Sequence, residues 1–374
     1  MKKNILENIG FKFISKRLKP LCFSDSFSYF YKKGKIFTLN NENKLQLLIK
    51  IPLSFKNKVF CKFRITERFF RLEPQSALIA FDCLFVTLHD GILCYNQKDK
   101  TTKIYKFRKN YIHTSELTLI KNIKGFDNCV VFGEYFYNEN RESVCIYALK
   151  NLEKGFERVY EFPKGAIRHI HCIKVNTANN CIYALTGDET KESGIFEIEN
   201  NFKSIKPIAI GDQKYRAVIM FFDNSNAYYA TDYPSSKNHL CKINLLNGSV
   251  KEIETLCGPC TVGAQLDQGF LFSSSVETIE PKNHSKLEKI KYLLSHKIAS
   301  GILDNKSRLY YFNGTLKVIS EFKKDCLSAG AFRFGRIIPY FDSHRKIIYL
   351  YCCCLKRIDG KLYFIKEEDF LKNE

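Results

Sequence analysis

The sequence predicts an all-β protein, a single β-propeller of seven blades, and two observations carry this prediction. From about residue 28 onward, short runs rich in Val, Ile, Phe, Tyr and Thr alternate with clusters of Asn, Asp, Gly and Lys, which is the pattern of strands and turns. Groups of such runs repeat with a period in the forties of residues, which is typical of propeller blades. Six and eight blades are the alternatives to seven.

The N-terminal segment, residues 1–20, is predicted to contain a short helix. Apolar residues recur there at helical spacing, Lys and Arg lie between them, and Pro20 would end the helix. The apolar positions are Ile5, Leu6, Ile9, Phe13, Ile14 and Leu18. A basic amphipathic helix of this kind either lies on an anionic membrane surface or packs on the domain with its basic face in water.

The remaining elements read as strands, and no Pro, Gly or Ser linker divides them, so residues 28–368 form one propeller domain. The convincing helix outside the N-terminus is at 286–294. Strands are expected at 35–39, 45–51, 84–88, 130–136, 182–185, 228–231 and 347–351. Further blades are expected at 28–53, 80–107, 302–322 and 334–368.

The repeat is clearest in three stretches that begin at Asn128, Asn180 and Asn226. Each has a turn Asn, a buried strand and then a carboxylate, and a fourth, 268–275, continues the series without the Asn or the acid. The starts are therefore 52, 46 and 42 residues apart. The acids are Glu134, Asp188 and Asp232. If the strand before each acid lines the central channel, the three carboxylates meet at one mouth, where they repel one another unless cations or a ligand lie between them.

Cationic and imidazole side chains open the same units: Arg168, His169 and His171 precede Asp188, and Gln213 and Arg216 precede Asp232. Residues two apart on a strand face the same side, so the two histidines share a face. The pair fits a general acid and base, half of a metal site completed by Gln213 or Asp188, or a structural partner for the acids. No cofactor is required, and a divalent metal at the histidines is the alternative.

Several of these stretches resemble one protein family. They are Gly133–Asn138, Ile167–His171, Thr186–Asp188, Gly211–Ala217 and Thr231–Asp232. Residues 128–243 are similar to uncharacterised bacterial propellers related to the Asp-box (BNR-repeat, sialidase-like) proteins, which are associated with surface-polysaccharide biosynthesis. The Asp boxes expected at 149–156 and 198–205 are degenerate. The resemblance implies a propeller and a carbohydrate role, but the third arginine of a sialidase has no counterpart here, and a polysaccharide lyase using His and Gln is the rival.

The function that the residues favour is action on an acidic or phosphorylated glycan, as a hydrolase or lyase. The catalytic candidates are His169, His171, Asp188 and Glu134, and the substrate-binding candidates are Arg168, Gln213, Arg216 and Asp232. The alternative is a non-catalytic propeller that binds a glycan or protein in a polysaccharide assembly at the inner membrane face. Histidines that point into an open pocket and converge with the acids favour the enzyme. Histidines that are buried and mutually satisfied count against it.

Charge and cysteine usage narrow the partners and the compartment. The chain of 374 residues has a net charge of +20, of which residues 1–124, with 25 basic and 9 acidic side chains, supply +16. No nucleic-acid-binding module is recognisable, so no nucleic-acid partner is expected. The number of Cys is odd, 15, and many of them lie within apolar runs, which indicates buried thiols in a reducing compartment. Residues 1–20 lack the pattern of a secretory signal, so we expect a cytoplasmic protein, with residues 1–20 as the candidate contact to the inner membrane surface. The oligomeric state is not predicted.

Two cysteine motifs are set aside. Cys257-Gly258-Pro259-Cys260 has the letters of a thioredoxin motif, but it joins two strand-like runs, where Gly-Pro is an ordinary turn pair. The consecutive residues Cys352, Cys353 and Cys354 lack the two-residue gap of a zinc knuckle.

Overall fold

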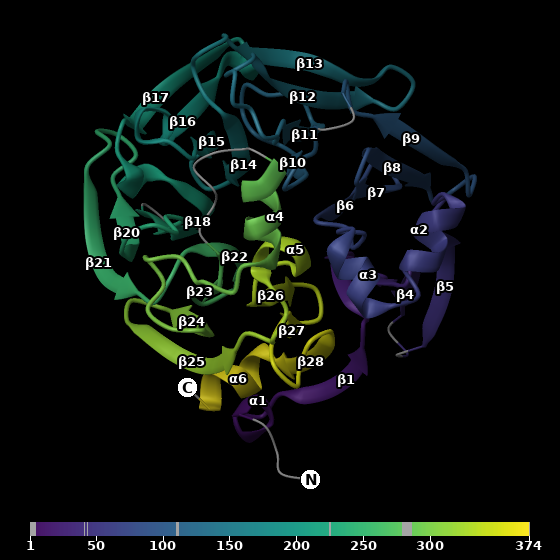
Figure 1. Ribbon diagram of the computed structural model, residues 1–374. Coiled ribbons are helices and arrows are strands. Elements are labelled where there is room, and N and C mark those ends of the chain that lie inside the picture. The colour runs from purple at the N-terminus through teal and green to yellow at the C-terminus, as the bar shows by residue number, and fades with distance from the viewer. Residues whose placement is uncertain are drawn as a thin grey trace. The chain divides into compact units, whose positions relative to one another are not determined.

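The structure is a computed structural model that describes residues 5–40, 42, 44–109, 112–223, 226–278 and 286–373. In these residues, 28 strands form seven sheets of four strands each. The fold is therefore a seven-bladed β-propeller, as the sequence predicts (Figure 1). No helix in this part of the chain is long and apolar enough to span a membrane.

The chain divides into two compact units, which are described separately. Unit 1 comprises Met1–Glu73, Tyr233–Asn238 and Glu254–Glu374, and unit 2 comprises Pro74–Asp232 and His239–Ile253. The strands of unit 2, sheet by sheet, are β6 (Ala77–Ala80), β7 (Cys83–Leu88), β8 (Gly91–Asn96) and β9 (Thr102–Lys106); β10 (Thr118–Ile120), β11 (Cys129–Gly133), β12 (Val144–Asn151) and β13 (Gly155–Phe162); β14 (His169–Asn176), β15 (Cys181–Gly187), β16 (Gly194–Glu199) and β17 (Ser204–Ile210); and β18 (Ala217–Asp223), β19 (Asn226–Thr231), β20 (Asn238–Ile243) and β21 (Val250–Leu256), the last two crossing the unit boundary at their ends.

Unit 1 holds the other three sheets and the helices. Its strands are β2 (Lys19–Phe23), β3 (Ser28–Lys32), β4 (Lys35–Leu39) and β5 (Leu45–Lys50); β22 (Cys260–Gln265), β23 (Phe270–Ser274), β24 (Lys306–Phe312) and β25 (Leu316–Lys323); and β26 (Arg336–Asp342), β27 (Ile347–Cys353), β28 (Lys361–Lys366) and β1 (Lys12–Lys16). Its helices are α1 (Ile5–Asn8), α2 (Phe55–Phe60), α3 (Arg64–Phe69), α4 (Lys286–Leu294), α5 (Ala329–Phe332) and α6 (Glu367–Asn373).

The middle strands of the sheets explain why the apolar runs are continuous rather than alternating. Every residue of β11, and all but the first of β15 and β19, is buried, because both faces of these strands are covered. The cores are aliphatic and aromatic, and thiols such as Cys129 and Cys241 fill small positions within them. No two of the 15 cysteines form a disulfide.

The short N-terminal helix is confirmed, but it ends at Asn8, and the helical spacing that continues to Leu18 is misleading. Residues 12–16 form β1, which pairs with β28 in register Lys12↔Phe364, and Pro20 lies within β2. Pairing with β28 decides the conformation here, because it completes the backbone hydrogen bonds that a four-residue helix cannot supply.

The order of strands within the repeat also differs from the prediction. The strand before each of the three acids is the second of its sheet, not the first. In unit 2 the first strands, β6, β10, β14 and β18, lie next to one another in succession (Figure 1). The stretches at 268–275 and 302–322 belong to one sheet rather than two blades, and α4 lies in the connection between them.

Helix α4 is confirmed at Lys286–Leu294, whereas α2, α3, α5 and α6 were not expected. The Cys257–Cys260 segment is the turn between β21 and β22, as predicted.

Candidate functional site

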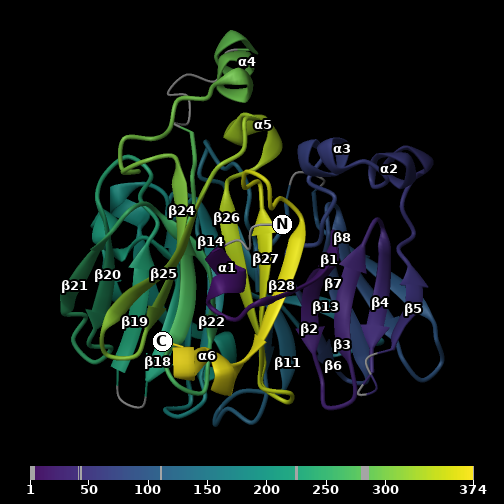
Figure 2. The same cartoon turned by 90° about the horizontal axis from the view of Figure 1, so that it is seen from below.

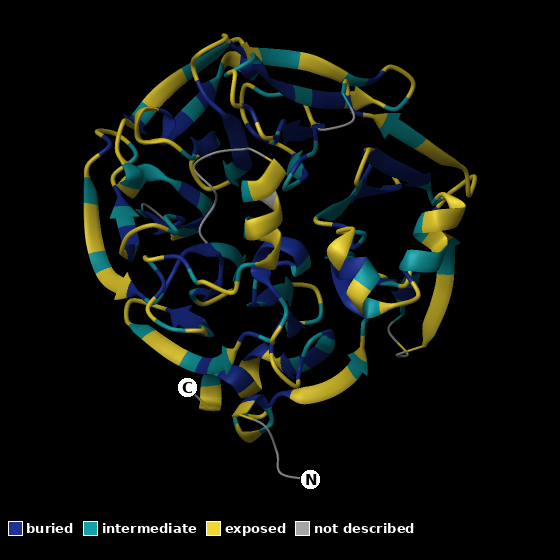
Figure 3. Ribbon diagram, viewed as in Figure 1, coloured by how far each residue is buried: buried dark blue, intermediate teal, exposed yellow. Residues whose placement is uncertain are grey.

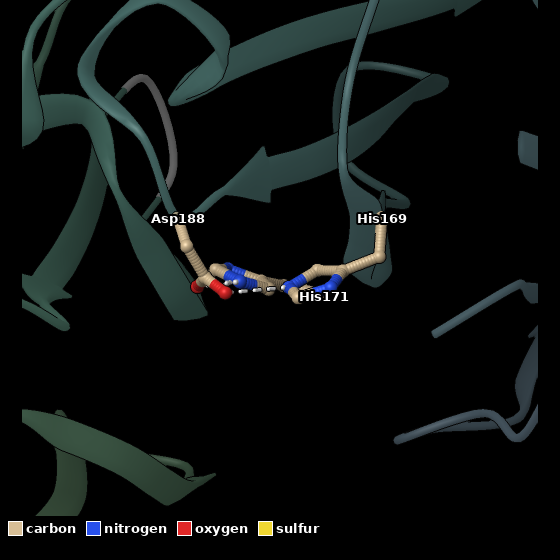
Figure 4. Close-up of side chains that lie close together, drawn as sticks. All are labelled: His169, His171 and Asp188. Atoms are coloured by element: carbon tan, nitrogen blue, oxygen red, sulfur yellow. Dashed lines mark hydrogen bonds and ion pairs between the residues drawn. The ribbon is translucent and has the colours of Figure 1, made fainter. Parts of the chain in front are cut away.

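A largely covered carboxylate, Asp188, is the centre of the predicted site, and its side chain is 13% exposed. It directly follows β15, and His169 and His171 reach it from the start of β14 (Figure 4). Arg168, which directly precedes β14, reaches it as well. Arg216, which precedes β18, reaches it from the next sheet. The distances to the carboxylate oxygens are 3.1 Å from Arg168 Nη1, 3.4 Å from His169 Nε2, 3.3 Å from His171 Nε2 and 2.9 Å from Arg216 Nη2.

Local backbone features place these groups. His171 is the extra residue of a β-bulge between β14 and β15, where Ile170 faces Thr186 and Cys172 faces Leu185. Bulges near the start of a sheet's first strand recur in β2, β18 and β22, so the bulge belongs to the fold rather than to this site. Gly187 leaves no room for a side chain, because a Cβ there would lie 2.8 Å from His171 Cε1.

The backbone fixes which ring nitrogens carry hydrogen. His169 Nδ1 donates to the carbonyl of Phe136 (3.1 Å), and His171 Nδ1 donates to that of Ala217 (2.8 Å). A carbonyl can only accept, so in a neutral ring the Nε2 atom is a bare lone pair. Both Nε2 atoms face Asp188, which as a carboxylate is also an acceptor. Two acceptors at this distance require a proton or a cation between them.

Protonating His169 or His171 at Nε2 would supply that proton, but it is unfavourable in this environment. Burial lowers the pKa of His169, and the attraction of Asp188 offsets this only in part. Burial alone would raise the pKa of Asp188, but positive charge on His169 and Arg216 holds it well below its usual range. The His169 and His171 ring centres are 4.9 Å apart, so two imidazolium ions would repel each other.

A metal ion satisfies the same three atoms without this cost. The ligand atoms of His169, His171 and Asp188 all lie within 4.8 Å of one another. Ligands of a tetrahedral Zn²⁺ at about 2.0–2.1 Å are about 3.4 Å apart, and the two nitrogen–oxygen distances are 3.4 and 3.3 Å. Metal-bound histidines usually donate their second ring N–H to a carbonyl or carboxylate, as both do here. The residues therefore fit a divalent cation held by two histidines and one carboxylate.

The histidines are not open to bulk solvent. His169 is 2% exposed and His171 is 1% exposed. The ring of Tyr135 lies 4.0 Å from that of His169, and the Arg168 guanidinium lies 4.6 Å from the ring of Tyr137, which is at the surface. Among the described residues, the buried atoms Arg168 Nε and His169 Nε2 have no hydrogen-bond partner, nor has Gln213 Oε1.

The other predicted site residues divide into two groups. Gln213 and Asp232 belong to this cluster: Gln213 Nε2 donates to the backbone carbonyl of Asp188 (2.7 Å), and Asp232 lies 3.6 Å from Arg216. Gln213 thus holds the backbone of Asp188 through its amide nitrogen, and its buried Oε1 has no hydrogen-bond partner in the described part of the chain.

The side chain of Glu134 binds elsewhere. It accepts two hydrogen bonds from Arg108, at 2.6 and 2.8 Å, and one from the Cys145 amide. This pair lines a cavity of about 130 Å³ with five aromatic rings, those of Tyr105, Phe107, Phe132, Tyr147 and Phe156. Sequence reasoning missed Arg108, because it follows β9 in the preceding sheet and shares no repeat position with the acids.

Comparison with known proteins identifies the fold and nothing finer. No family model matches the chain, and no curated protein matches it. Among solved structures, it is similar to a chain of the mitotic checkpoint complex (TM-score 0.53, 8% identity, covering 95% of this chain and 91% of that one). It is also similar to the Dos1 propeller (0.51, 10%, 95% and 80%) and to the AfRom2 CNH domain (0.52, 10%, 95% and 98%). The protein is thus a β-propeller protein, and the Asp-box relationship stays a prediction.

Proposed function

We propose that this protein is a non-catalytic binding propeller that holds a divalent metal at His169, His171 and Asp188, and that the positive charge of this site attracts an anionic ligand of the acidic-glycan type to the surface beside it. One observation carries the proposal: two histidine lone pairs, fixed by backbone carbonyls, face one ionised carboxylate. With the metal, two arginines and two aspartates, the site has a net charge of about +2, which favours an anion.

The hydrolase or lyase predicted from the sequence has less support. A general acid or base must come within hydrogen-bond reach of the substrate, and both histidines are covered. Arg168 and Arg216 also hold Asp188 already, so they are not free to clamp a substrate carboxylate. A binding role needs neither group to move a proton.

Metal titration tests the proposal. Metal-free protein should take up one equivalent of Zn²⁺ or Co²⁺, and its melting temperature should rise. At a free metal concentration a hundred times the Kd, the unfolding free energy should increase by about 2.7 kcal/mol. Tetrahedral Co²⁺ would add visible absorption bands, a readout that does not depend on ligand or turnover. His171→Ala should lose the bound equivalent of metal. The control is His239→Gln, which should keep it; His239 is half-buried, lies in the sheet of β18 to β21 and pairs with Glu252 of the same sheet.

Two outcomes decide against the proposal. If wild-type protein binds no more metal than His171→Ala, the histidines are structural partners of Asp188. If acidic oligosaccharides such as oligoglucuronate are cleaved by wild type and not by His171→Ala, the protein is an enzyme. Binding of the same oligosaccharide in the presence of Zn²⁺, and its loss on chelation, is the expected result.

A further inference from the structure

Helix α3 in unit 1 has its polarity reversed. Its inward face is charged: Glu67 and Arg68 are buried, and Arg68 pairs with Asp325 at 2.5 Å. Arg64 pairs from the same face with Asp359 at 2.9 Å. Its outward side and ends are apolar, with Phe63, Ile65, Phe69 and Phe70 all exposed. A helix on a soluble domain normally buries the apolar side and exposes the charges.

The apolar surface continues onto the neighbouring helices. Phe70 stacks on Phe60 of α2 with ring centres 4.3 Å apart, and Phe69 lies 5.5 Å from Phe332 of α5. Phe55, the first residue of α2, is 83% exposed. Figure 2 shows α2, α3, α5 and α4 beyond the same end of the strands of unit 1.

Helix α4 presents a second apolar stripe. Leu287, Ile290 and Leu294 are spaced three and four residues apart, which places them on one helix face, and all are exposed. Much of α4 is coloured as exposed in Figure 3. The C-terminal end of α4 is fixed to the start of α5, where the Ser328 hydroxyl donates to the carbonyl of Leu293.

The concentration of exposed apolar side chains is unusual. Twenty large apolar side chains are exposed in the described residues, and ten of them lie within residues 55–70 and 287–303. Scattered apolar residues on a surface need no explanation, but a gathered set marks an interaction site. We call this set the helical face: Phe55, Phe63, Ile65, Phe69, Phe70, Leu287, Ile290, Leu293, Leu294 and Leu303.

Exposed cations outnumber acids around the helical face in the described residues. Seven exposed cations lie among or beside these residues, whereas the acids Glu288, which pairs with Lys291 at 2.8 Å, and Asp304 are only half-exposed. The cations are Lys56, Lys58, Lys62, Arg71, Lys286, Lys291 and Lys297. Aromatic and aliphatic side chains interleaved with lysine are the composition of helices that lie in the interface of an anionic bilayer.

We propose that the helical face docks unit 1 onto an anionic membrane surface, with the phenylalanines and leucines entering the headgroup region and the lysines facing the lipid phosphates. This attachment site is distinct from residues 1–20, where strand β1 is engaged by β28. It is also independent of the proposed metal site. The charged inner face of α3 suits this role, because its ion pairs hold the helix on the sheet while its apolar side stays outward.

Vesicle co-sedimentation tests the proposal, with phosphatidylcholine vesicles and with the same vesicles carrying phosphatidylglycerol. Wild-type protein should bind the anionic vesicles and release them as salt rises from about 0.1 to about 0.5 M. Phe63→Ser with Phe69→Ser, or Lys56→Gln with Lys62→Gln, should weaken binding about tenfold or more. The matched controls are Leu246→Ser with Val318→Ser, and Lys206→Gln with Lys251→Gln, which change exposed residues outside the face and should bind as wild type does.

Three results would overturn the proposal. If wild-type protein does not bind anionic vesicles, it has no membrane site of this kind. Equal losses in face and control variants mean that overall charge, not this surface, drives binding. Self-association in sedimentation velocity that Phe63→Ser with Phe69→Ser abolishes, without vesicle binding, makes the face an interface between copies of the chain. Melting curves should show that all variants remain folded, because every substituted side chain is exposed.

Discussion

At the scale of single residues, each of the recurring carboxylates is paired with an arginine. The sequence predicts that Glu134, Asp188 and Asp232 hold equivalent places, and each is bound by an arginine. Arg216 contacts both Asp188 of one sheet and Asp232 of the next, so it links successive sheets of unit 2. The repulsion expected between the acids is relieved by these cations, which is a structural use of the same residues.

The Glu134–Arg108 pair offers a test of that structural use. Glu134 is buried, whereas Arg108 is partly exposed, so Glu134→Gln keeps the shape but removes the charge that orients Arg108. We expect a loss of about 2 kcal/mol in unfolding free energy, below the 3–5 kcal/mol typical of fully buried pairs, because Arg108 regains water. Urea denaturation measures it.

The control for this substitution is Glu161→Gln, whose ion pair with Arg158 is exposed in the same sheet. It should leave the midpoint unchanged. Equal effects of the two substitutions would mean that Glu134 gains nothing from Arg108. If Glu134→Gln instead abolished metal uptake, Glu134 would belong to the Asp188 site after all.

At the scale of elements, the strands and two of the helices, α1 and α4, were predictable, whereas α2, α3, α5 and α6 were not. The middle strands are buried on both faces, so they can be recognised in the sequence as apolar runs. The repeat of turn Asn, strand and acid located three of them. The histidine pair and Asp188 could be placed together for the same reason. Helix α3 was missed because periodicity searches assume that the apolar face is buried, and here the charged face is buried.

The N-terminal segment shows the opposite error. Its helical spacing is real, but strand pairing with β28, 350 residues away, overrides it, and no local pattern contains that partner. Arg108 was missed in the same way, because it is a partner from another sheet. The local sequence pattern predicted individual strands and their turns. The pairings between residues far apart in the sequence could be seen only in the structure.

Removing residues 1–17 tests the role of the N-terminal segment as part of a sheet. The deletion takes away β1 and leaves β28 with an unpaired edge, and it removes Leu6 and Phe11 from the core beside Phe370. Two fully buried apolar side chains contribute about 3–6 kcal/mol. We therefore expect a lower melting temperature and aggregation through the exposed edge, measured by calorimetry and light scattering.

Lys12→Gln with Lys16→Gln is the matched control, since it removes two exposed charges and leaves β1 in place. It should melt as wild type does. A deletion variant as stable as wild type would show that β1 contributes little. Loss of membrane binding on this deletion would not identify an anchor, because the fold itself is perturbed.

At the scale of the whole molecule, repeated strand patterning specifies the fold with little constraint on sequence. The solved propellers cited above share only 8–10% identity with this chain, yet the match covers 95% of it. A sheet needs apolar middle strands, turns and polar edges, which many sequences supply. The charge is set separately: most of the excess of +20 belongs to residues 1–124, which include Lys56 and Lys58 of α2 and Lys62 between α2 and α3.

The buried thiols make the stability of the whole chain sensitive to alkaline pH. Burial raises the pKa of Cys94, Cys129 and Cys241 to about 12 and that of Cys145 to about 11. In the unfolded chain these thiols ionise near 8.5. A group whose pKa is raised by folding contributes stability that is complete below its unfolded pKa and is lost as pH rises through the folded value.

We therefore expect the unfolding free energy to be flat from about pH 7 to 8 and to fall above about pH 8.5, by up to about 1.4 kcal/mol per pH unit for each such thiol. Urea denaturation in reducing buffer at stepped pH values measures the slope. Cys129→Ala with Cys241→Ala should make the decline shallower although it lowers stability at pH 7, because cavities replace the sulfurs. Cys326→Ala, at the exposed cysteine, should leave the slope as it is. A slope that none of these substitutions changes would assign the alkaline loss to groups other than the thiols.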